Sequence, residues 1–342
     1  YNIEIMPDAK PIIDPRAVVR RLLVLLPISV GISVVVALVS TGTSEILKLE
    51  AFSFWLFAAA AGLRLVPWMS KAFRLTNWMH FLGHRFSFAE GLRISIMSEL
   101  GMALTPTAVG GQPVKAGMLY QRGVSLGEAT SLTTIQTVED LTFYAIGLPL
   151  ALTLASLRAK AALNRVMEQE VMGTGGWLIA AGVVVAVVVA AVLLARAFGV
   201  FPKLRRRLRA FGNEFKRLYA EIIKRGKQRF ALNVAVAAVH WVSRYSVVAT
   251  LTLSLGYEVN FLNFLVLQWV LFAIMAFVPT PGATGGAEGL FVLLFTGVLP
   301  RQALGTILIG WRFLDFYFTT ILALAVLGLG RLGTRAPDAL ED

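Results

Sequence analysis

The sequence predicts an all-α polytopic membrane protein, with about six full spans and two re-entrant pairs of broken helices arranged as an inverted repeat. Composition is the first reason. Of the 342 residues, 57% are hydrophobic and 15% are charged, and the mean hydropathy is +0.71. Soluble domains have about 45–50% apolar and about 25% charged residues, so a soluble enzyme is excluded as the main interpretation. The other two reasons are long apolar stretches and two Pro/Gly interruptions.

Apolar stretches long enough to cross a bilayer, which takes about 20 residues, recur along the chain. They lie at 22–40, 51–69, 126–157, 176–197, 231–256 and 303–329. The first follows Arg16, Arg20 and Arg21, as in a signal peptide, but no clean cleavage site follows Ala37. We therefore expect a retained signal anchor.

Two further apolar regions are interrupted. Residues 88–121 contain Leu-Thr-Pro-Thr-Ala-Val-Gly-Gly-Gln-Pro at 104–113, and residues 261–300 contain Val-Pro-Thr-Pro-Gly-Ala-Thr-Gly-Gly-Ala-Glu at 278–288. Prolines and paired glycines break helices, so each region predicts two half-helices around a polar break. Irregular backbone is not tolerated against lipid, so both breaks must be buried in protein or line a wet cavity.

The two breaks share the pattern Pro-x-Ala-x-Gly-Gly-x, at 106–112 and 281–287. With the topology below, the first opens toward the cytoplasm and the second toward the outside. Paired broken segments of opposite orientation indicate an inverted-repeat transporter with a binding site near the midplane. The alternative is two coincidental helix kinks.

The positive charges follow a membrane topology. With the N-terminus inside, 24 of the 32 Lys and Arg residues fall on the cytoplasmic side, five outside, and Arg64, Arg244 and Arg312 within spans. This bias predicts a multi-pass protein of the cytoplasmic (inner) membrane with both termini cytoplasmic. It also explains the net charge of +12 without nucleic acid as a partner.

A basic amphipathic helix is expected over 199–229. Its apolar residues recur at helical spacing: Leu204, Leu208, Phe211, Phe215, Leu218 and Ile222. Basic residues lie between them, as in interfacial helices on an anionic leaflet. The segment is either a topology determinant only or a collector of anionic lipid headgroups.

Cofactor chemistry is not expected. The chain has no cysteine and three histidines, which excludes disulfides and thiolate metal sites and argues against a metal centre. We expect no metal, no cofactor and no catalytic residue.

The breaks predict an anion-binding site. A half-helix that starts inside the membrane presents free N–H groups and a positive dipole end, and glycine lets an anion approach them closely. Side-chain donors would be Gln112 and Lys115 near Gly110 and Gly111, and Thr284 at the second break. The alternative for Thr284 is a satisfied helix cap.

Ionisable residues inside spans are costly and functional by default. They are Arg64, Glu99, Glu139, Asp140, His240, Arg244, Glu288, Arg312 and Asp315. Glu288 adjoins the second break, and the forks of Arg244 and Arg312 fit phosphate or carboxylate. Alternatively, these arginines only neutralise buried acids. Glu139 and Asp140 are adjacent, so we expect them to point apart and to make a poor catalytic pair.

Four motifs resemble the lysylphosphatidylglycerol synthase transmembrane-region family. They are Thr-Pro-Thr-Ala-Val-Gly-Gly-Gln-Pro-Val-Lys-Ala at 105–116, Val-Glu-Asp at 138–140, Pro-Thr-Pro-Gly-Ala-Thr-Gly-Gly-Ala-Glu at 279–288, and Trp-Arg at 311–312. The family includes the flippase half of the multiple peptide resistance factor. The resemblance implies a helical domain with re-entrant segments that handles lipids with charged or sugar headgroups.

By the same resemblance, the functional positions are Gly110, Gly111, Lys115, Glu139, Asp140, Pro281, Gly285, Gly286, Glu288 and Arg312. We expect Arg in the family where Lys115 stands, and Lys lacks the guanidinium fork.

These inferences define one transmembrane lipid-transport domain over 22–330, between cytoplasmic segments at 1–21 and 331–342. No soluble synthase domain follows residue 330, so we expect a translocating module. The expected function is a lipid flippase or transporter and not an enzyme, with membrane lipids and the anionic leaflet as partners and a homodimer left open. The alternatives are a membrane-embedded transferase or accessory subunit acting on lipid-linked sugars, and a structural membrane partner without transport.

Overall fold

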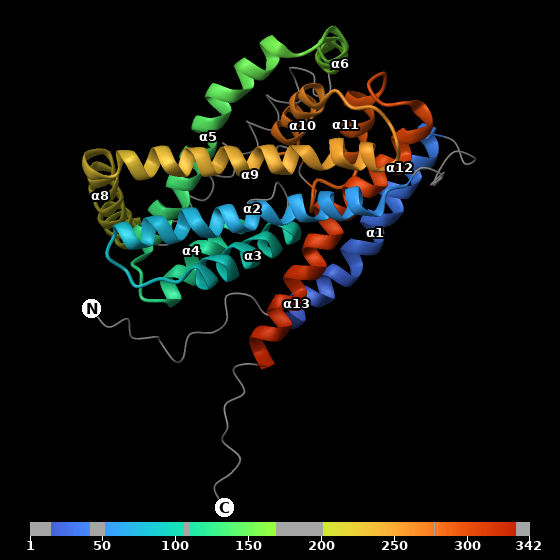
Figure 1. The fold of residues 1–342 in the computed structure, drawn as a ribbon. Coiled ribbons are helices and arrows are strands. Elements are labelled where there is room, and N and C mark those ends of the chain that lie inside the picture. Colours follow the sequence, from blue (N-terminus) through green and yellow to red (C-terminus); the bar gives the residue numbers. More distant parts are fainter. Residues whose placement is uncertain are drawn as a thin grey trace, which may run out of the picture.

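The computed structural model describes residues 15–41, 52–105, 110–168, 201–276, 278 and 280–332 (Figure 1). The expected span at 176–197 lies outside these residues, as do 106–109 of the first break and the two chain ends. The described residues form helices and no β-strand, apart from an isolated bridge between Thr296 and Leu299. The all-α class of the prediction is therefore confirmed.

The described helices, in chain order, are α1 (Pro15–Thr41), α2 (Phe54–Phe81), α3 (Phe88–Leu104), α4 (Gly111–Gln121), α5 (Leu126–Leu154), α6 (Leu157–Glu168), α8 (Phe201–Arg225), α9 (Lys227–Ser254), α10 (Phe261–Met275), α11 (Gly286–Phe295), α12 (Arg301–Arg312), the π-helix η1 (Phe313–Phe318) and α13 (Thr319–Leu332). Four stretches of the described chain are long and apolar enough to cross a membrane: Val18–Thr41, Leu126–Leu154, Lys227–Ser254 and the continuous α12–η1–α13 rod over Arg301–Gly328. The chain is thus a polytopic membrane protein by composition and helix length.

Helices α2 and α9 form the centre of the bundle and run antiparallel, side by side (Figure 1). At one end of the pair, the amide of Ser53 donates to the carbonyl of Ser254 at 2.7 Å. Toward the other end, Asn77 Nδ2 donates to Asn233 Oδ1 at 2.9 Å. These bonds fix the register of the two helices and define the two ends of the bundle.

The first broken region forms the α3–α4 hairpin. Ser87 and Glu90 make a capping box that starts α3, and the chain leaves α4 after Gln121. Both points lie at the end of the bundle where α2 finishes, in an apolar cluster with Phe86, Leu119 and Leu218. The hairpin therefore opens at the α2 C-terminal end.

The second broken region forms the α10–α11 hairpin, which opens at the opposite end. Asn260 caps the start of α10, and the amide of Ser156 donates to Asn263 Oδ1 at 3.1 Å, beside the α5–α6 turn. Tyr257 and Leu255, which follow α9, pack into the same core as α10 and α11. The two hairpins thus point toward each other from opposite ends of the bundle (Figure 1).

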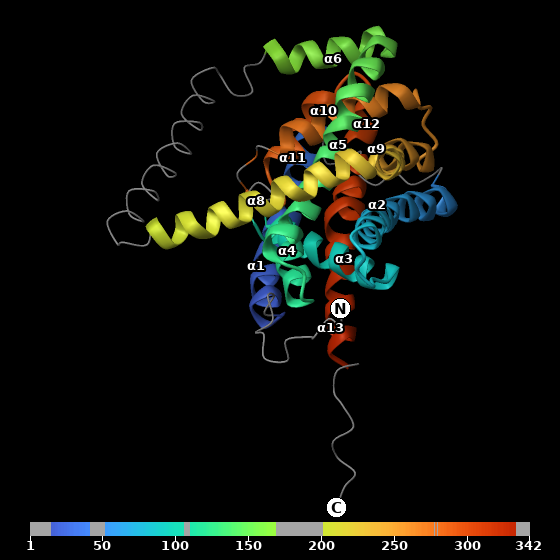
Figure 2. The same cartoon turned by 90° about the vertical axis from the view of Figure 1, so that its left-hand side faces the viewer.

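The amphipathic segment is a helix, as predicted. Helix α8 packs Leu218 and Ile222 against the end of α2, and Lys216 and Arg217 are exposed. Figure 2 shows α8 along the side of the bundle and α6 lying across the far end of α5. The side chains of Leu204, Leu208 and Phe211 lie outside the described residues.

The charge count needs one correction. The 24 basic residues counted as cytoplasmic include Lys71 and Arg74, because they follow the expected span at 51–69. Helix α2 instead continues to Phe81 and directs both side chains into the interior. Lys115, counted with them, is also buried. Removing these three leaves 21 basic residues against five, so the positive-inside bias persists.

Candidate functional site

Five ionisable residues meet in the middle of the bundle. We call Arg64, Lys71, Glu99, Arg244 and Asp315 the central cluster. Glu99 accepts from Arg64 Nη2 at 2.8 Å and from Lys71 Nζ at 3.2 Å. Asp315 pairs with Arg64 Nε at 2.8 Å and with Arg244 Nη2 at 3.0 Å. With every group ionised, three cations face two anions, so the cluster has a net charge of +1.

The π-helix η1 places Asp315 in this cluster. A π-turn leaves backbone carbonyls without their usual α-helical partners, and such turns are frequent at functional sites. Here the carbonyl of Asp315 accepts from Arg64 Nη2 at 3.1 Å and from Thr319 Oγ1 at 3.0 Å. Arg64 therefore holds both the side chain and the backbone of Asp315, which links α2 to the α12–η1–α13 rod.

A cavity of about 190 Å³ adjoins the central cluster. Its charged lining consists of Glu99, Arg244, Asp315 and Arg312. The apolar lining comes from both hairpins: Met102 and Ala103 at the tip of α3, and Val278, Gly282 and Ala283 in the second break, beside Phe272 and Phe316. The cavity thus lies where the two hairpin tips converge, and both charged and apolar side chains line it.

Arg244 is the cavity residue with spare donor capacity. Its Nε has no hydrogen-bond partner among the described residues, although the atom is buried. The guanidinium carbon lies 4.3 Å from the centroid of the Phe272 ring, a cation–π distance. The guanidinium is therefore held in place by Asp315 and Phe272 while part of its fork remains free.

The second break is tied to α1 and α12 by a separate network. We call Ser29, Ser33, Thr284, Glu288, Arg312 and Tyr317 the break cluster. Glu288 Oε1 pairs with Arg312 Nε at 2.8 Å and accepts from Ser33 Oγ at 2.7 Å. Arg312 Nη1 also donates to the carbonyl of Gly282 at 3.2 Å, and its Nη2 reaches Ser29 Oγ at 3.3 Å. This network fixes the irregular backbone that borders the cavity.

One expectation about the second break is wrong. The amide of Gly285 is not free for a ligand, because Glu288 Oε2 accepts from it at 2.8 Å. Gly285 has φ +88°, which favours glycine, and this conformation turns the chain into α11. The carboxylate of Glu288 thus occupies the helix N-terminus where an anion was expected. Thr284 also makes local contacts: its Oγ1 lies 2.9 Å from the carbonyl oxygen of Pro281 and 3.2 Å from Ser29 Oγ.

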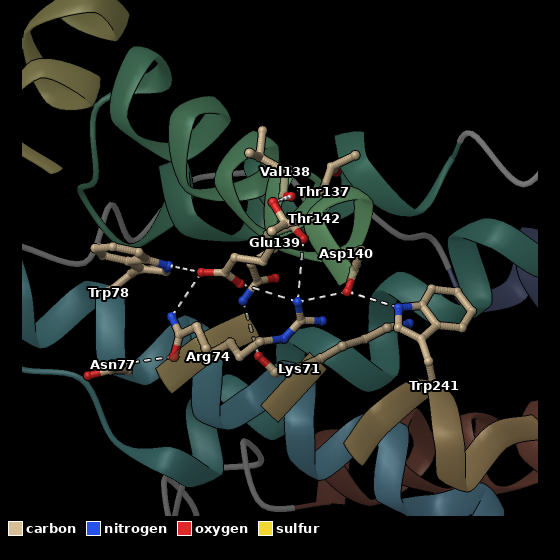
Figure 3. A network of polar contacts seen from close by, with 12 residues as sticks. Lys71, Arg74, Asn77, Trp78, Thr137, Val138, Glu139, Asp140, Thr142 and Trp241 are labelled. Carbon is tan, nitrogen blue, oxygen red and sulfur yellow. Dashed lines mark hydrogen bonds and ion pairs between the residues drawn. The ribbon is translucent and has the colours of Figure 1, made fainter. Parts of the chain in front are cut away.

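Glu139 and Asp140 belong to a third network, around Arg74 (Figure 3). Arg74 Nη1 lies 3.2 Å from Glu139 Oε2 and 2.8 Å from Asp140 Oδ1. Glu139 also accepts from Trp78 Nε1 at 2.5 Å and from Asn233 Nδ2 at 2.9 Å, whereas Trp241 Nε1 donates to Asp140 at 3.1 Å. The expectation that the two carboxylates point apart is therefore wrong, because one guanidinium draws both toward α2.

The first break does not line the cavity with its glycines. A Cβ on Gly110 would lie 2.5 Å from the carbonyl oxygen of Gly101, and one on Gly111 would lie 2.9 Å from that of Ser98. These glycines let α4 pack against α3, as small residues do between membrane helices. The amide of Gly110 is satisfied by Thr105 Oγ1 at 2.8 Å.

The other predicted residues of the first break point elsewhere. Gln112 is exposed and donates to Thr137 Oγ1 at 3.4 Å, while Lys115 is buried and bonds to Gln136 of α5. Of the predicted set, the structure brings Thr284, Gly285, Glu288 and Arg312 into one network, with Arg244 across the cavity. Gly286 lies in the same turn, where a Cβ would be 2.7 Å from the Val278 side chain.

Several interior polar residues were absent from the predicted site. Arg64, Lys71 and Arg74 are spaced by seven and three residues, which places them on one face of α2, so this spacing was a usable signal. Ser29 and Ser33 lie one turn apart in an apolar span, and this spacing was a weaker signal. His240 is buried in contact with Trp241, and neither ring nitrogen has a hydrogen-bond partner among the described residues. No group of His, Asp and Glu that could hold a metal ion occurs in the described ranges.

Two sequence comparisons with known proteins identify the family of this chain. The model of a family described as "Lysylphosphatidylglycerol synthase TM region" matches residues 24–323. A protein named "UPF0104 membrane protein" from Archaeoglobus fulgidus is 25% identical over 287 residues, covering 77% of this chain and 83% of that protein. The family match spans both hairpins, the central cluster and the break cluster.

Proposed function

Because the chain belongs to the lysylphosphatidylglycerol synthase transmembrane-region family, whose role is lipid-related, we propose that it moves a lipid with an anionic or glycosylated headgroup across or out of the cytoplasmic membrane. Phospholipids are the first candidates. The cavity between the hairpin tips takes the polar headgroup, and the acyl chains remain in the bilayer.

The observation that carries this proposal is the unbalanced charge beside the cavity. Three cations and two anions form the central cluster, and Arg244 keeps a buried donor without a partner. An uncompensated buried charge is costly, so an anion entering the cavity gains the full benefit of pairing with it. A phosphate fits a guanidinium fork, and a hydroxyl-rich headgroup could use the same donors.

The arrangement of the hairpins supports a transport role. Each hairpin opens at a different end of the bundle, and residues of both line one cavity. We infer that the hairpins are re-entrant segments related as an inverted repeat, so that the cavity lies near the bilayer midplane. Small movements of either hairpin would then expose the headgroup to one leaflet at a time, in two states whose balance the bound lipid shifts.

The same proposal sets the orientation. The α2 C-terminal end, with the exposed basic residues of α8, faces the cytoplasm, and the opposite end faces outward. On this assignment both chain termini are cytoplasmic. Helix α8 lies on the anionic inner leaflet, with Leu218 and Ile222 against the bundle and the exposed Lys216 and Arg217 toward headgroups.

Reconstitution tests the proposal. Purified protein in vesicles that contain a headgroup-quenchable fluorescent phosphatidylglycerol should move the probe between leaflets. The double substitution Glu288→Gln/Arg312→Gln removes a charge pair without changing net charge and loosens the second break, so we expect translocation to fall at least tenfold. Glu258→Gln/Arg301→Gln, which also removes one acid and one base but at exposed positions, is the matched control and should transport normally. Equal rates for wild type and the double variant, with both folded, would refute the role of this site.

A further inference from the structure

A second cavity lies at the α2 C-terminal end of the bundle, between α3 and α4. Its volume is about 430 Å³, and its lining includes Arg85, Arg93, Arg122 and Glu90. It shares no residue with the interior cavity. Three guanidinium groups and one carboxylate give this surface pocket a net charge of +2.

The single carboxylate is already engaged. Glu90 Oε1 pairs with Arg122 Nη1, and Glu90 Oε2 accepts from the amide of Ser87 at 2.8 Å, where it completes the α3 capping box. Arg85 and Arg93 are exposed, and neither makes an ion pair with another described residue. No described residue neutralises their charges, and the pairing with Glu90 holds Arg122 in the lining of the same pocket.

The remaining lining is apolar except for Gln121. Met79, Phe86 and Ile94 belong to the buried cluster beneath it, and Met118 of α4 closes one side. A soluble anion gains nothing from such walls, whereas the glycerol backbone and upper acyl carbons of a lipid do. The pocket therefore combines three guanidinium groups with adjacent apolar side chains.

We propose that this pocket binds the phosphate group of a glycerophospholipid, as a site separate from the interior cavity. Arg85 and Arg93 contact the phosphate oxygens, Arg122 adds the free part of its fork, and the methionine- and phenylalanine-lined wall receives the glycerol region. Basic pockets between membrane helices are a known form of anionic lipid recognition. The site lies at the end of the bundle that also holds α8. A lipid bound there is placed either to enter the interior cavity or to stabilise the packing of α3 and α4.

The test is a lipid titration followed by native mass spectrometry of the full chain in neutral detergent. Wild-type protein should bind phosphatidylglycerol more tightly than phosphatidylcholine. In an Arg244→Gln background, which disables the interior cavity, adding Arg85→Gln/Arg93→Gln should weaken phosphatidylglycerol binding by roughly tenfold. In the same background, the control Lys160→Gln/Arg301→Gln removes the same charge from exposed positions at the other end and should leave the affinity unchanged. Equal weakening in both variants, or none in the first, would overturn the proposal.

Two further arms separate the outcomes. The variant Arg244→Gln disables the interior cavity, and it should still bind lipid at Arg85 and Arg93. Complete loss of phosphatidylglycerol binding in Arg244→Gln would overturn the second site. The transport proposal would remain intact. Inorganic phosphate at millimolar concentration should fail to displace the lipid. If the protein binds inorganic phosphate saturably and shows no preference for phosphatidylglycerol, the ligand of the pocket is a soluble phosphate compound. That result would overturn the lipid assignment.

Discussion

Neutralising Asp315 tests the charge balance of the central cluster. Asp315→Asn leaves Glu99 as the only anion for three cations and raises the net charge of the cluster from +1 to +2. The side chain of Asp315 is 7% exposed, and it pairs with Arg64 and Arg244. Removing one partner of a buried ion pair lowers the free energy of unfolding by about 3–5 kcal/mol. The Arg244 side chain is 14% exposed at the cavity, so we expect a value near the lower limit, about 3 kcal/mol.

The second half of the double-mutant cycle is Arg244→Gln. This variant leaves Arg64 and Lys71 to balance Glu99 and Asp315, so its cost should be small, about 1 kcal/mol. Combining it with Asp315→Asn returns the cluster to +1. We therefore expect the double variant to lose about 2 kcal/mol of its free energy of unfolding. This loss is smaller than the sum of the two single losses, and smaller than the loss in Asp315→Asn alone.

Free energies of unfolding from sodium dodecyl sulfate titration in mixed micelles, followed by tryptophan fluorescence, provide the comparison. Arg301→Gln serves as a control for loss of one positive charge at an exposed position. If the double variant is less stable than Asp315→Asn, the two residues do not compensate each other. The excess positive charge would then have no energetic meaning, and the reasoning behind the binding cavity would fail.

Three further substitutions follow from local geometry. Glu139→Gln should destabilise the protein by about 3 kcal/mol, because the buried guanidinium of Arg74 loses one of its two carboxylate partners. A loss under about 0.5 kcal/mol in the same titration would contradict this. Ala283→Gly should leave stability unchanged or raise it by about 0.5 kcal/mol, because Ala283 has φ +54°, and a clear loss would show that this backbone strain is absent. Gly110→Ala should lower the melting temperature and impair transport, because its Cβ would clash with the backbone of Gly101; Gly212→Ala, with open space around it, should do neither, and equal behaviour of the two variants would refute close packing of the hairpin.

The sequence was sufficient for the class of fold and for the second break. Long apolar stretches and Pro/Gly interruptions are local signals. Helices α5, α9 and the α12–η1–α13 rod begin and end within a few residues of the predicted spans, whereas α1 starts earlier and α2 ends later than predicted. Thr284, Glu288 and Arg312 were recognised because charge is rare in apolar segments. Ser29 and Ser33 gave only a weak signal as a serine pair one turn apart in an apolar span. Their pairing with Glu288 and Arg312 was not predictable, because they lie more than 250 residues away and only the packing of α1 against α11 and α12 brings them close.

The first break shows why residue type alone was insufficient. Paired glycines fit both a close approach to a ligand and a close approach of two helices, and in Gly110 and Gly111 the second use prevails. A similar ambiguity affected the end of α2. Lys71 and Arg74 were read as the start of a cytoplasmic segment, because positive charge usually marks a span end. Here the acids of α3 and α5 compensate them, and that compensation depends on tertiary structure.

The most direct test of the central claim is covalent capture of a headgroup in the cavity. The chain has no cysteine, so Ala103→Cys places a single thiol on the cavity wall. In vesicles, a phosphatidylethanolamine with maleimide on its amino group, which has a net charge of −1, should form a one-to-one adduct detected by intact mass. Adding Arg244→Gln should suppress the adduct, and Leu141→Cys, on the exposed face of α5, should not react. Absence of reaction at Ala103→Cys, or equal reaction with and without Arg244, would contradict a lipid headgroup in this cavity.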